Sequence, residues 1–326
     1  MMTGELYKDH IMHLYNKLFS NIDEIALAVS GGADSIAMLY MMHEWAKAKS
    51  KTLIILTVNH NLRSEALEEC EYVKKCANDL GLNHVLLDWK HNGVSSNVHD
   101  KARKARYGLM TKWCKANGVG VLCTAHHKDD RIENFFIRVF RGSGILGLID
   151  NQEIIYEGIR VIRPVFDLSK AELITYLKAK KIKWFEDKSN DDDKYLRTSI
   201  RRWIGLLPEE LDIELLKNRV IGVKGNLLRT SKLINRIFEQ ELESKVNIHN
   251  DHTVLTELPE DEEIAYMILS HIITLVGGRK APRLNSIEIL YKKLLSGKLA
   301  KWTFGGCIIE HKGKKIIFYQ ETDQNI

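Results

Sequence analysis

The sequence of 326 residues contains no run of about 18 apolar residues, the length that a helix needs to cross a bilayer. Its first residues, MMTGELYKDHIMHLYNK, carry acidic side chains and no small-residue cleavage site, so they do not resemble a secretory signal. With 44% hydrophobic and 28% charged residues, the composition is that of a globular protein. We therefore expect a cytoplasmic protein without a membrane segment.

Cysteine is scarce, and no two cysteines form a Cys-x-x-Cys pair. This pattern argues against a disulfide framework and against a zinc or iron–sulfur site built from cysteines. It predicts reduced, mostly buried thiols. The five cysteines are Cys70, Cys76, Cys114, Cys123 and Cys307.

The net charge of +5 is small but unevenly distributed. Residues 279–315 contain ten Lys or Arg and two acidic residues, a net charge of +8, so the other residues sum to −3. Clustered basic residues gain affinity for phosphates by releasing counterions. The basic stretch indicates either a polyanionic partner or a solvated surface, and charge alone does not choose between them.

Short apolar segments alternate with helical patterns between residues 24 and 140. This alternation predicts an α/β fold with a doubly wound, mostly parallel sheet, whose ligands bind beyond the carboxyl ends of the strands. Polar clusters stand there at residues 30–35, 59–63 and 126–133. The predicted strands are 25–30, 53–59, 85–88 and 121–125, and the predicted helices are 36–48, 65–80 and 98–116.

The rest of the chain predicts a division into domains. A hairpin (154–165) and a helix (170–180) complete an N-terminal domain of residues 1–208. Residues 209–245 contain no proline and predict a helical linker. Residues 246–326 predict a smaller, mostly helical, basic domain, with two amphipathic helices (261–276 and 286–296) and a closing hairpin.

The segment SGGADS, residues 30–35, follows the first predicted strand and precedes a helix. Two glycines let the backbone approach an anion closely, and the helix N-terminus adds exposed amides and a positive dipole end. The loop therefore predicts a phosphate site that needs no lysine. The motif resembles the loop of the N-type ATP pyrophosphatases, which implies that ATP is bound through its pyrophosphate portion and attacked at the α-phosphorus.

A second cluster carries Asp130 and Glu133, which lie three residues apart and share one face if a helix begins near Asp129. Two carboxylates there could coordinate Mg²⁺ beside ATP, bind an amine, or do both. They could also merely complement the helix dipole. Their predicted position at the end of a strand, after two histidines, favours a functional role.

The chain resembles the tRNA(Ile)-lysidine synthetase family along nearly its whole length. The segments that carry the resemblance are TAHHKDDRIENFFIRVFRGSGILGL, ARKARY (102–107), RGSG (141–144), RPVF (163–166), WFEDKSNDDDKYLRTSIRRW (184–203) and WTFGGCII (302–309). The resemblance implies that ATP adenylates O2 of the wobble cytidine in the CAU anticodon of tRNA(Ile). The side-chain amine of L-lysine then displaces AMP to form lysidine, so that the codon read changes from AUG to AUA.

The resemblance also implies roles for individual residues. The residues that it implies bind the nucleotide are Ser30, Gly31, Gly32, Ala33, Asp34, Ser35 and Arg106. The resemblance implies that Asp130 and Glu133 bind Mg²⁺ and the lysine amine. The implied catalytic residues are Asp34, His126, Asp130, Glu133, Asn190 and Arg201. The basic C-terminal domain is the expected tRNA contact, and a homodimer is left open.

Arg197, Arg201 and Arg202 could bind phosphate through their planar guanidinium groups, or form salt bridges with residues 191–193. Three positions depart from the family: Asn59 and Asn61 replace the Asp and Gly of Asp-His-Gly-Leu-Arg, and Thr198 replaces a common Asn. The extra C-terminal domain of longer family members is expected to be missing.

Three alternative functions remain open from sequence. A tRNA thiolation enzyme would share the loop but needs paired cysteines. A small-molecule amidotransferase or synthetase needs an ammonia source and no basic domain. A nucleotide-binding RNA-interaction protein would need no acidic pair for chemistry.

Overall fold

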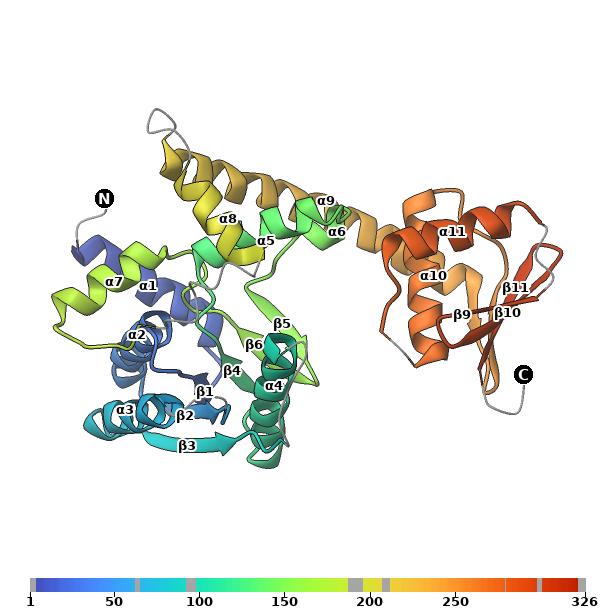
Figure 1. Ribbon diagram of the computed structural model, residues 1–326. Helices are drawn as coiled ribbons and strands as arrows, with labels where there is room; N and C mark the ends of the chain where they lie inside the picture. Colours follow the sequence, from blue (N-terminus) through green and yellow to red (C-terminus); the bar gives the residue numbers. More distant parts are fainter. Residues whose placement is uncertain are drawn as a thin grey trace. The chain divides into compact units, whose positions relative to one another are not determined.

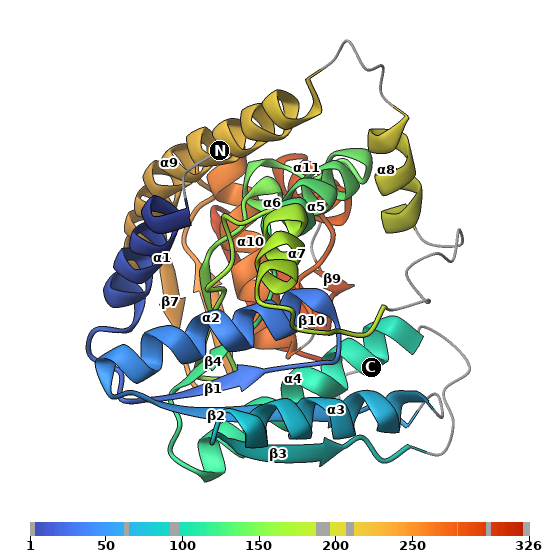
Figure 2. The same cartoon turned by 90° about the vertical axis from the view of Figure 1, so that its left-hand side faces the viewer.

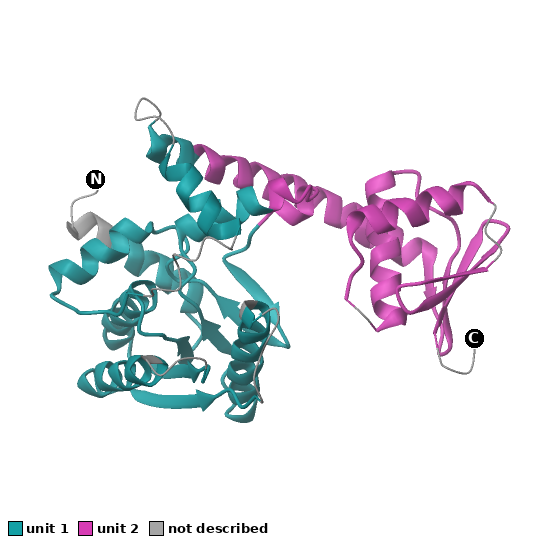
Figure 3. Cartoon of the chain, in the orientation of Figure 1, with its two compact units in different colours: residues 1–137, 150–218 teal, residues 138–149, 219–326 magenta. Residues whose placement is uncertain are grey.

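The computed structural model describes residues 4–61, 65–91, 98–186, 196–206, 212–278, 280–297 and 301–321. The chain forms two compact units (Figure 3). Unit 1 comprises residues 1–137 and 150–218, and unit 2 comprises residues 138–149 and 219–326.

Unit 1 is built on a six-stranded sheet in the order β3-β2-β1-β4-β6-β5. All neighbouring pairs are parallel except β5 and β6, which form the predicted antiparallel hairpin. Figure 2 shows β1, β2 and β3 side by side. The strands are β1 (Glu24–Ala28), β2 (Thr52–Asn59), β3 (Asn83–Asp88), β4 (Val121–Cys123), β5 (Glu153–Tyr156) and β6 (Ile159–Ile162).

Helices cover both faces of this sheet. Alternate side chains of each strand point to opposite faces, so one strand contributes to two cores. Ile25 and Leu27 of β1 enter one core, with residues of α1, α2, α3 and α7, while Ala26 enters the opposite core with residues of α4 (Figure 1). The predicted doubly wound α/β fold is confirmed. The helices of this unit are α1 (Gly4–Phe19), α2 (Ala33–Lys49), α3 (Glu65–Asp79), α4 (Val98–Ala116), α7 (Lys170–Ala179) and α8 (Leu196–Gly205). Two further helices, α5 (Lys128–Phe140) and α9 (Ile213–Lys245), contribute residues to both units.

The strand order determines where a ligand can bind. β1 lies between β2 and β4, so the connections on its two sides leave the sheet in opposite directions. In open α/β sheets this switch point opens a crevice at the carboxyl ends of the strands. The segments that follow β1 and β4, residues 29–32 and 124–127, meet at that point.

Unit 2 contains a five-stranded antiparallel sheet in the order β7-β8-β11-β10-β9. Its core joins Ile272 of α10 and Leu290 of α11 to Phe318 of β11. The two predicted helices and the closing hairpin are confirmed, and three further strands extend the hairpin into a sheet. The elements are α6 (Ile145–Leu148), β7 (Val246–Ile248), β8 (His252–Leu255), α10 (Glu262–Gly277), α11 (Leu284–Leu295), β9 (Lys301–Phe304), β10 (Cys307–Lys312) and β11 (Lys315–Gln320). Within the described ranges, no helix is both long enough and apolar enough to cross a membrane.

The end of α10 packs directly on the turn between β9 and β10, which yields a test of unit 2. A Cβ atom at Gly277 would lie 2.2 Å from the carbonyl oxygen of Gly305. Gly277→Ala should therefore lower the free energy of unfolding by about 2 kcal/mol or more, because backbone must move. Urea unfolding followed by circular dichroism measures this loss.

Gly222→Ala, inside α9 in the same unit, is the matched control. No atom lies within 4 Å of a Cβ built there, so the helix should gain up to about 1 kcal/mol. Equal unfolding midpoints for the two variants would contradict the packing of α10 on this turn.

Candidate active site

The loop between β1 and α2 is held by its own side chains and by one neighbouring segment. The Ser35 hydroxyl donates to the Ser30 carbonyl oxygen at 2.6 Å and accepts from the Ser30 amide at 3.1 Å. The Phe185 amide donates to the Gly31 carbonyl oxygen at 2.8 Å. A Cβ at Gly31 would lie 3.2 Å from both the Glu69 Cβ and the Phe185 ring, so this position favours glycine.

The start of α2 presents backbone donors. Gly32 is the N-cap and supplies no side-chain acceptor. The amides of Ala33, Asp34 and Ser35 stand in the first turn, where no helical carbonyl precedes them as an acceptor. With the positive end of the helix dipole, these amides form an arrangement that can receive phosphate oxygens without a lysine.

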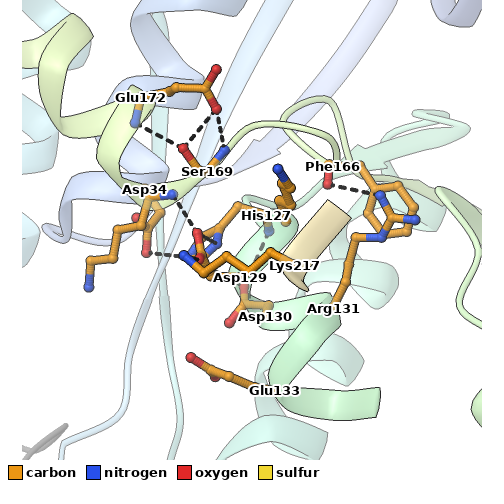
Figure 4. A network of polar contacts seen from close by, with 12 residues as sticks. Asp34, His127, Asp129, Asp130, Arg131, Glu133, Phe166, Ser169, Glu172 and Lys217 are labelled. Carbon is orange, nitrogen blue, oxygen red and sulfur yellow. Dashed lines mark hydrogen bonds and ion pairs between the residues drawn. The ribbon is translucent and has the colours of Figure 1, made fainter. Parts of the chain in front are cut away.

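His127 is the centre of the polar network at the carboxyl edge of the sheet (Figure 4). Its side chain is 3% exposed. Its Nε2 atom lies 3.4 Å from Asp34 Oδ2 and 3.6 Å from Asp130 Oδ2, and its Nδ1 atom lies 3.8 Å from Asp129 Oδ2. Burial alone would lower the pKa of His127, but the hydrogen bond to Asp34 and the charges of the three aspartates raise it above its ordinary value.

The pKa of Asp34 shifts in the opposite direction, downward. Burial alone would raise it, but the hydrogen bond and charge of His127, followed by the charges of Lys170 and Arg201, bring it below its usual value. His127 therefore ties the phosphate loop to α5. The site residues expected from the sequence include His126 but not His127. The pattern His-His-x-Asp-Asp, which places two histidines directly before two aspartates, is the signal that could have indicated His127.

His126 lies in a different environment. Its Nδ1 atom is 3.0 Å from Thr124 Oγ1, and its Nε2 atom is 3.4 Å from an Arg103 nitrogen. Burial, together with the charges of Arg103, Arg163 and Arg106, lowers the pKa of His126 to about 3 against the opposing charge of Asp130. The imidazole is thus neutral. The structure brings the sequence-predicted residues His126 and Arg106 into one cationic neighbourhood.

Glu133 is buried in α5 and held by arginines of α8. Arg201 forms two hydrogen bonds to its carboxylate, one of 3.2 Å from Nη2 to Oε2, and the Arg197 Nε atom lies 3.3 Å from Oε2. Burial raises the pKa of Glu133 above its usual value despite the hydrogen bond from Arg201. These arginines therefore bind α5, while residues 190–193, including the predicted Asn190, lie outside the described residues.

Two further clamps position α5. Asp129 Oδ1 lies 2.8 Å from Lys217 Nζ of α9, and Asp129 Oδ2 accepts from the Lys170 amide of α7 at 2.7 Å. The buried Arg131 places its Nε atom 3.2 Å from Asp150 Oδ2 and its guanidinium carbon 3.8 Å from the centre of the Phe166 ring. The alignment of α5 with the phosphate loop rests on these contacts.

The donor set at this edge suits Mg²⁺. Asp34 and Asp130 approach the same nitrogen of His127, and Asp34 Oδ1 is buried without a hydrogen-bond partner. Mg²⁺ commonly takes one or two carboxylates and completes its shell with phosphates and water. No group of three or more His, Cys, Asp or Glu side chains placed for a metal occurs in the part of the chain that the structure describes.

The departures at the end of β2 have a local explanation. Asn61 adopts a φ of 50°, a left-handed conformation that Asn tolerates better than most residues other than Gly. The backbone amide of Asn61 donates to Asn59 Oδ1 at 3.0 Å, and the side-chain Nδ2 of Asn59 donates to Asp88 Oδ1 at 3.2 Å. The two asparagines thus form a turn of their own.

The cysteines do not support thiol chemistry. All five are free and buried. Burial raises the pKa of Cys114 to about 11 and that of Cys123 well above its ordinary value, so these thiols stay protonated. The thiolation alternative is therefore not favoured.

A glycine-rich phosphate loop at the switch point of a mostly parallel sheet defines a PP-loop nucleotide-binding domain, and residues 5–209 match the PP-loop domain family. The curated tRNA(Ile)-lysidine synthase of Orientia tsutsugamushi (strain Boryong) is 34% identical over 93% of this chain and 71% of its own length. That of Rickettsia bellii (strain OSU 85-389) is 36% identical over 94% of this chain and 74% of its own length. The chain belongs to the tRNA(Ile)-lysidine synthase family.

The fold is also found in solved structures, of which a tRNA-modifying enzyme is one example. The U34-tRNA thiolase NcsA from Methanococcus maripaludis, determined with its 4Fe-4S cluster, matches with a TM-score of 0.58 and 16% sequence identity. The match covers 69% of this chain and 80% of that one. At this identity the likeness concerns the fold alone.

The Arg131 clamp yields a stability prediction. Arg131→Met should lower the free energy of unfolding by about 3 kcal/mol, because the Asp150 carboxylate, whose side chain is only 13% exposed, loses the guanidinium of a buried arginine. Arg131→Lys should recover only part of the loss, since an ammonium cannot bind as a planar fork. Urea unfolding of the wild type and of the two variants measures these free energies.

The matched control is Arg160→Met, which breaks an arginine–carboxylate pair with Glu153 in which both side chains are about 40% exposed. A pair this exposed should contribute no more than about 1 kcal/mol. A loss at Arg160 equal to that at Arg131 would refute the clamp.

Proposed function

We propose that this chain is an ATP-dependent ligase that converts the wobble cytidine of the CAU anticodon of tRNA(Ile) to lysidine, using L-lysine. Family membership supports this function. The observation that carries it is the position of His127, which contacts Asp34 of the phosphate loop and Asp130 of α5 through one nitrogen. An acidic pair that can handle an amine therefore stands beside the loop that can hold ATP.

In the first step, the amides at the start of α2 hold the outer phosphates of ATP and leave the α-phosphate open. Cytidine O2 attacks the α-phosphorus, an O–P bond forms, and pyrophosphate leaves. The neutral His126 and the arginines around it lie at the same edge, where they can orient the adenylated base. Arg106 is one of these arginines.

In the second step, the lysine ε-amine attacks C2, a C–N bond forms, the C2–O2 bond breaks, and AMP leaves. The amine has a solution pKa of about 10.4, so it arrives protonated and must first lose a proton. A carboxylate whose pKa is raised toward neutrality is the better acceptor. Glu133, whose pKa burial raises, is the proposed acceptor, and Asp130 positions the ammonium.

Mg²⁺ is a proposed part of this site. Asp34 and Asp130 would hold it, because their carboxylates converge on His127 while Glu133 is engaged by arginines. When bound, Mg²⁺ supplies positive charge that offsets the charge of the ATP phosphates. The metal-binding pair expected from the sequence is Asp130 and Glu133. The pair proposed from the geometry is Asp34 and Asp130, so Asp130 is common to both.

The basic C-terminal unit is the proposed tRNA contact. Its net charge is concentrated in residues 279–315, and the Lys293 ammonium lies 3.8 Å from the centre of the Trp302 ring. Exposed lysines beside an aromatic ring suit phosphates and bases of RNA. Such contacts supply attraction and stacking, while base contacts decide which tRNA is chosen.

The proposed activity is tested by incubating the protein with ATP, Mg²⁺, labelled lysine and unmodified tRNA transcripts, followed by nucleoside analysis. Label should enter the CAU-anticodon isoleucine transcript, in a reaction that consumes ATP and releases AMP. Methionine transcripts with the same anticodon provide the specificity control. Failure to label any transcript, with tRNA binding intact, would favour a non-catalytic RNA-binding protein.

The acidic pair gives a second test. Asp130→Asn and Glu133→Gln should each lower the rate of lysine transfer by about 100-fold or more, because amine positioning and proton acceptance are lost. Affinity for the tRNA should not change. Glu71→Gln removes an exposed carboxylate of α3 and should leave the rate unchanged. Normal turnover by both variants of the pair would overturn their assignment.

A further inference from the structure

The long helix α9 contains a stretch in which all the charges are positive. Residues 215–238 include six Lys or Arg and no Asp or Glu, and acidic residues resume only at Glu239. An exposed helix face usually mixes charges of both signs, since opposite charges three or four residues apart stabilise a helix. The single sign of charge therefore indicates a role other than stabilising α9. The six residues are Lys217, Arg219, Lys224, Arg229, Lys232 and Arg236.

Three of these cations lie on the side of α9 that faces solvent, in the part of the helix that belongs to unit 2 (Figure 3). Arg229, Lys232 and Arg236 are exposed, and their spacings of three and four residues place them on one helix face. The other side of the helix packs against the core of unit 2 with Ile234, Ile237, Phe238 and Leu242. The core therefore holds α9 with the three cations pointing outward.

The exposed cations are not neutralised by neighbouring carboxylates. No ion pair joins Arg229, Lys232 or Arg236 to a residue within the described ranges. Arg229 Nη2 donates to the neutral side chain of Asn226, at 2.5 Å from Oδ1. At the end of the same helix, by contrast, Lys245 is paired with an acidic side chain. The charge of the three residues is thus available to an external anion.

Two glycines precede the cations on the same face. Gly222 and Gly225 lie seven and four residues before Arg229, and a Cβ built at either glycine would have no atom within 4 Å. Packing inside the protein therefore does not require glycine there, although glycine is a poor helix former. Without side chains at these positions, a ligand can approach the backbone of α9 closely.

We propose that the exposed face of α9, from Gly222 to Arg236, binds the sugar–phosphate backbone of the tRNA. This inference rests on the proposed function, since the RNA is the substrate of that reaction, and it adds a surface outside the basic stretch 279–315. The three cations span about 10 Å of the helix axis. The same length of a nucleic-acid duplex carries about six phosphate charges. The two arginines can each bind a phosphate through two nitrogens.

A membrane surface and an acidic protein are the competing partners for this face. A helix that lies on a membrane needs an apolar side directed at the lipid, and the apolar side of α9 is packed on the core of unit 2. Interfaces between proteins are depleted of charged residues at their centre. Clustered Arg and Lys are instead the main source of affinity for a nucleic-acid backbone. The composition of the face therefore favours RNA.

Because phosphates carry no sequence information, this face should add affinity but no selectivity. Replacing the three cations together, by Arg229→Gln, Lys232→Gln and Arg236→Gln, should weaken the binding of unmodified tRNA about tenfold or more. The slope of log affinity against log salt concentration should become shallower by about two to three. The kcat at saturating tRNA and the preference for isoleucine over methionine transcripts should not change. Fluorescence anisotropy of labelled transcripts in a series of salt concentrations measures affinity and slope.

Two control variants show whether charge at this place is responsible. The charge-conserving triple variant Arg229→Lys, Lys232→Arg and Arg236→Lys should keep the wild-type slope. The matched control neutralises three exposed lysines of unit 1 and should leave the slope unchanged. Its substitutions are Lys47→Gln, Lys75→Gln and Lys178→Gln.

The outcomes separate this inference from the proposed function. If the wild type forms lysidine while the triple glutamine variant keeps the wild-type affinity and slope, α9 does not contact the tRNA and the inference is wrong. An equal loss in the matched control would also overturn it, since the place of the charges would then not matter. If the wild type binds the transcripts but transfers lysine to none of them, the proposed function fails, while the slope still decides whether α9 binds RNA.

Discussion

The carboxyl edge of the sheet depends on one buried side chain, that of His127. Three aspartates surround it, one from the phosphate loop and two from the first turn of α5. Buried carboxylates at such separations repel one another unless a positive charge stands between them. Against the effect of burial, the hydrogen bond to Asp34 and the charges of the aspartates raise the pKa of His127 and so favour a positive charge at this point. A strand tip and a helix start that are about a hundred residues apart in the chain are thereby joined in one site.

The same rule of charge pairing organises the rest of the edge. Glu133 is held by Arg201, Asp129 by Lys217, and Asp150 by Arg131. Because these pairs position α5 from several sides, the carboxylates of its first turns are held in a fixed arrangement. One carboxylate oxygen at this edge, Asp34 Oδ1, is buried and has no hydrogen-bond partner among the described residues. It belongs to one of the two carboxylates that are proposed to hold Mg²⁺.

Local patterns predicted the elements of the fold well. The four parallel strands and the helices between them follow from short apolar runs separated by periodic segments, and the helix carrying Asp130 and Glu133 starts within a residue of its expected position. Helix α1 was not predicted, because its burial depends on Tyr15 and Phe19 meeting Trp45 of another helix. The three additional strands of unit 2 are too short to be recognised before they pair. The structure places His127 among the three aspartates, while the catalytic role expected for His126 stays a prediction.

The sequence by itself determined the parallel sheet, the glycine loop that presents bare amides, and the acidic pair on one helix face, because each arises from contacts among neighbours along the chain. Tertiary structure alone decided which histidine enters the acidic centre and which arginines neutralise Glu133. It also decided which side of α9 packs against a core and which side leaves three cations exposed. Those outcomes depend on burial and on pairing between distant segments, and electrostatic energies at such sites change with separations of an ångström, which no linear pattern records.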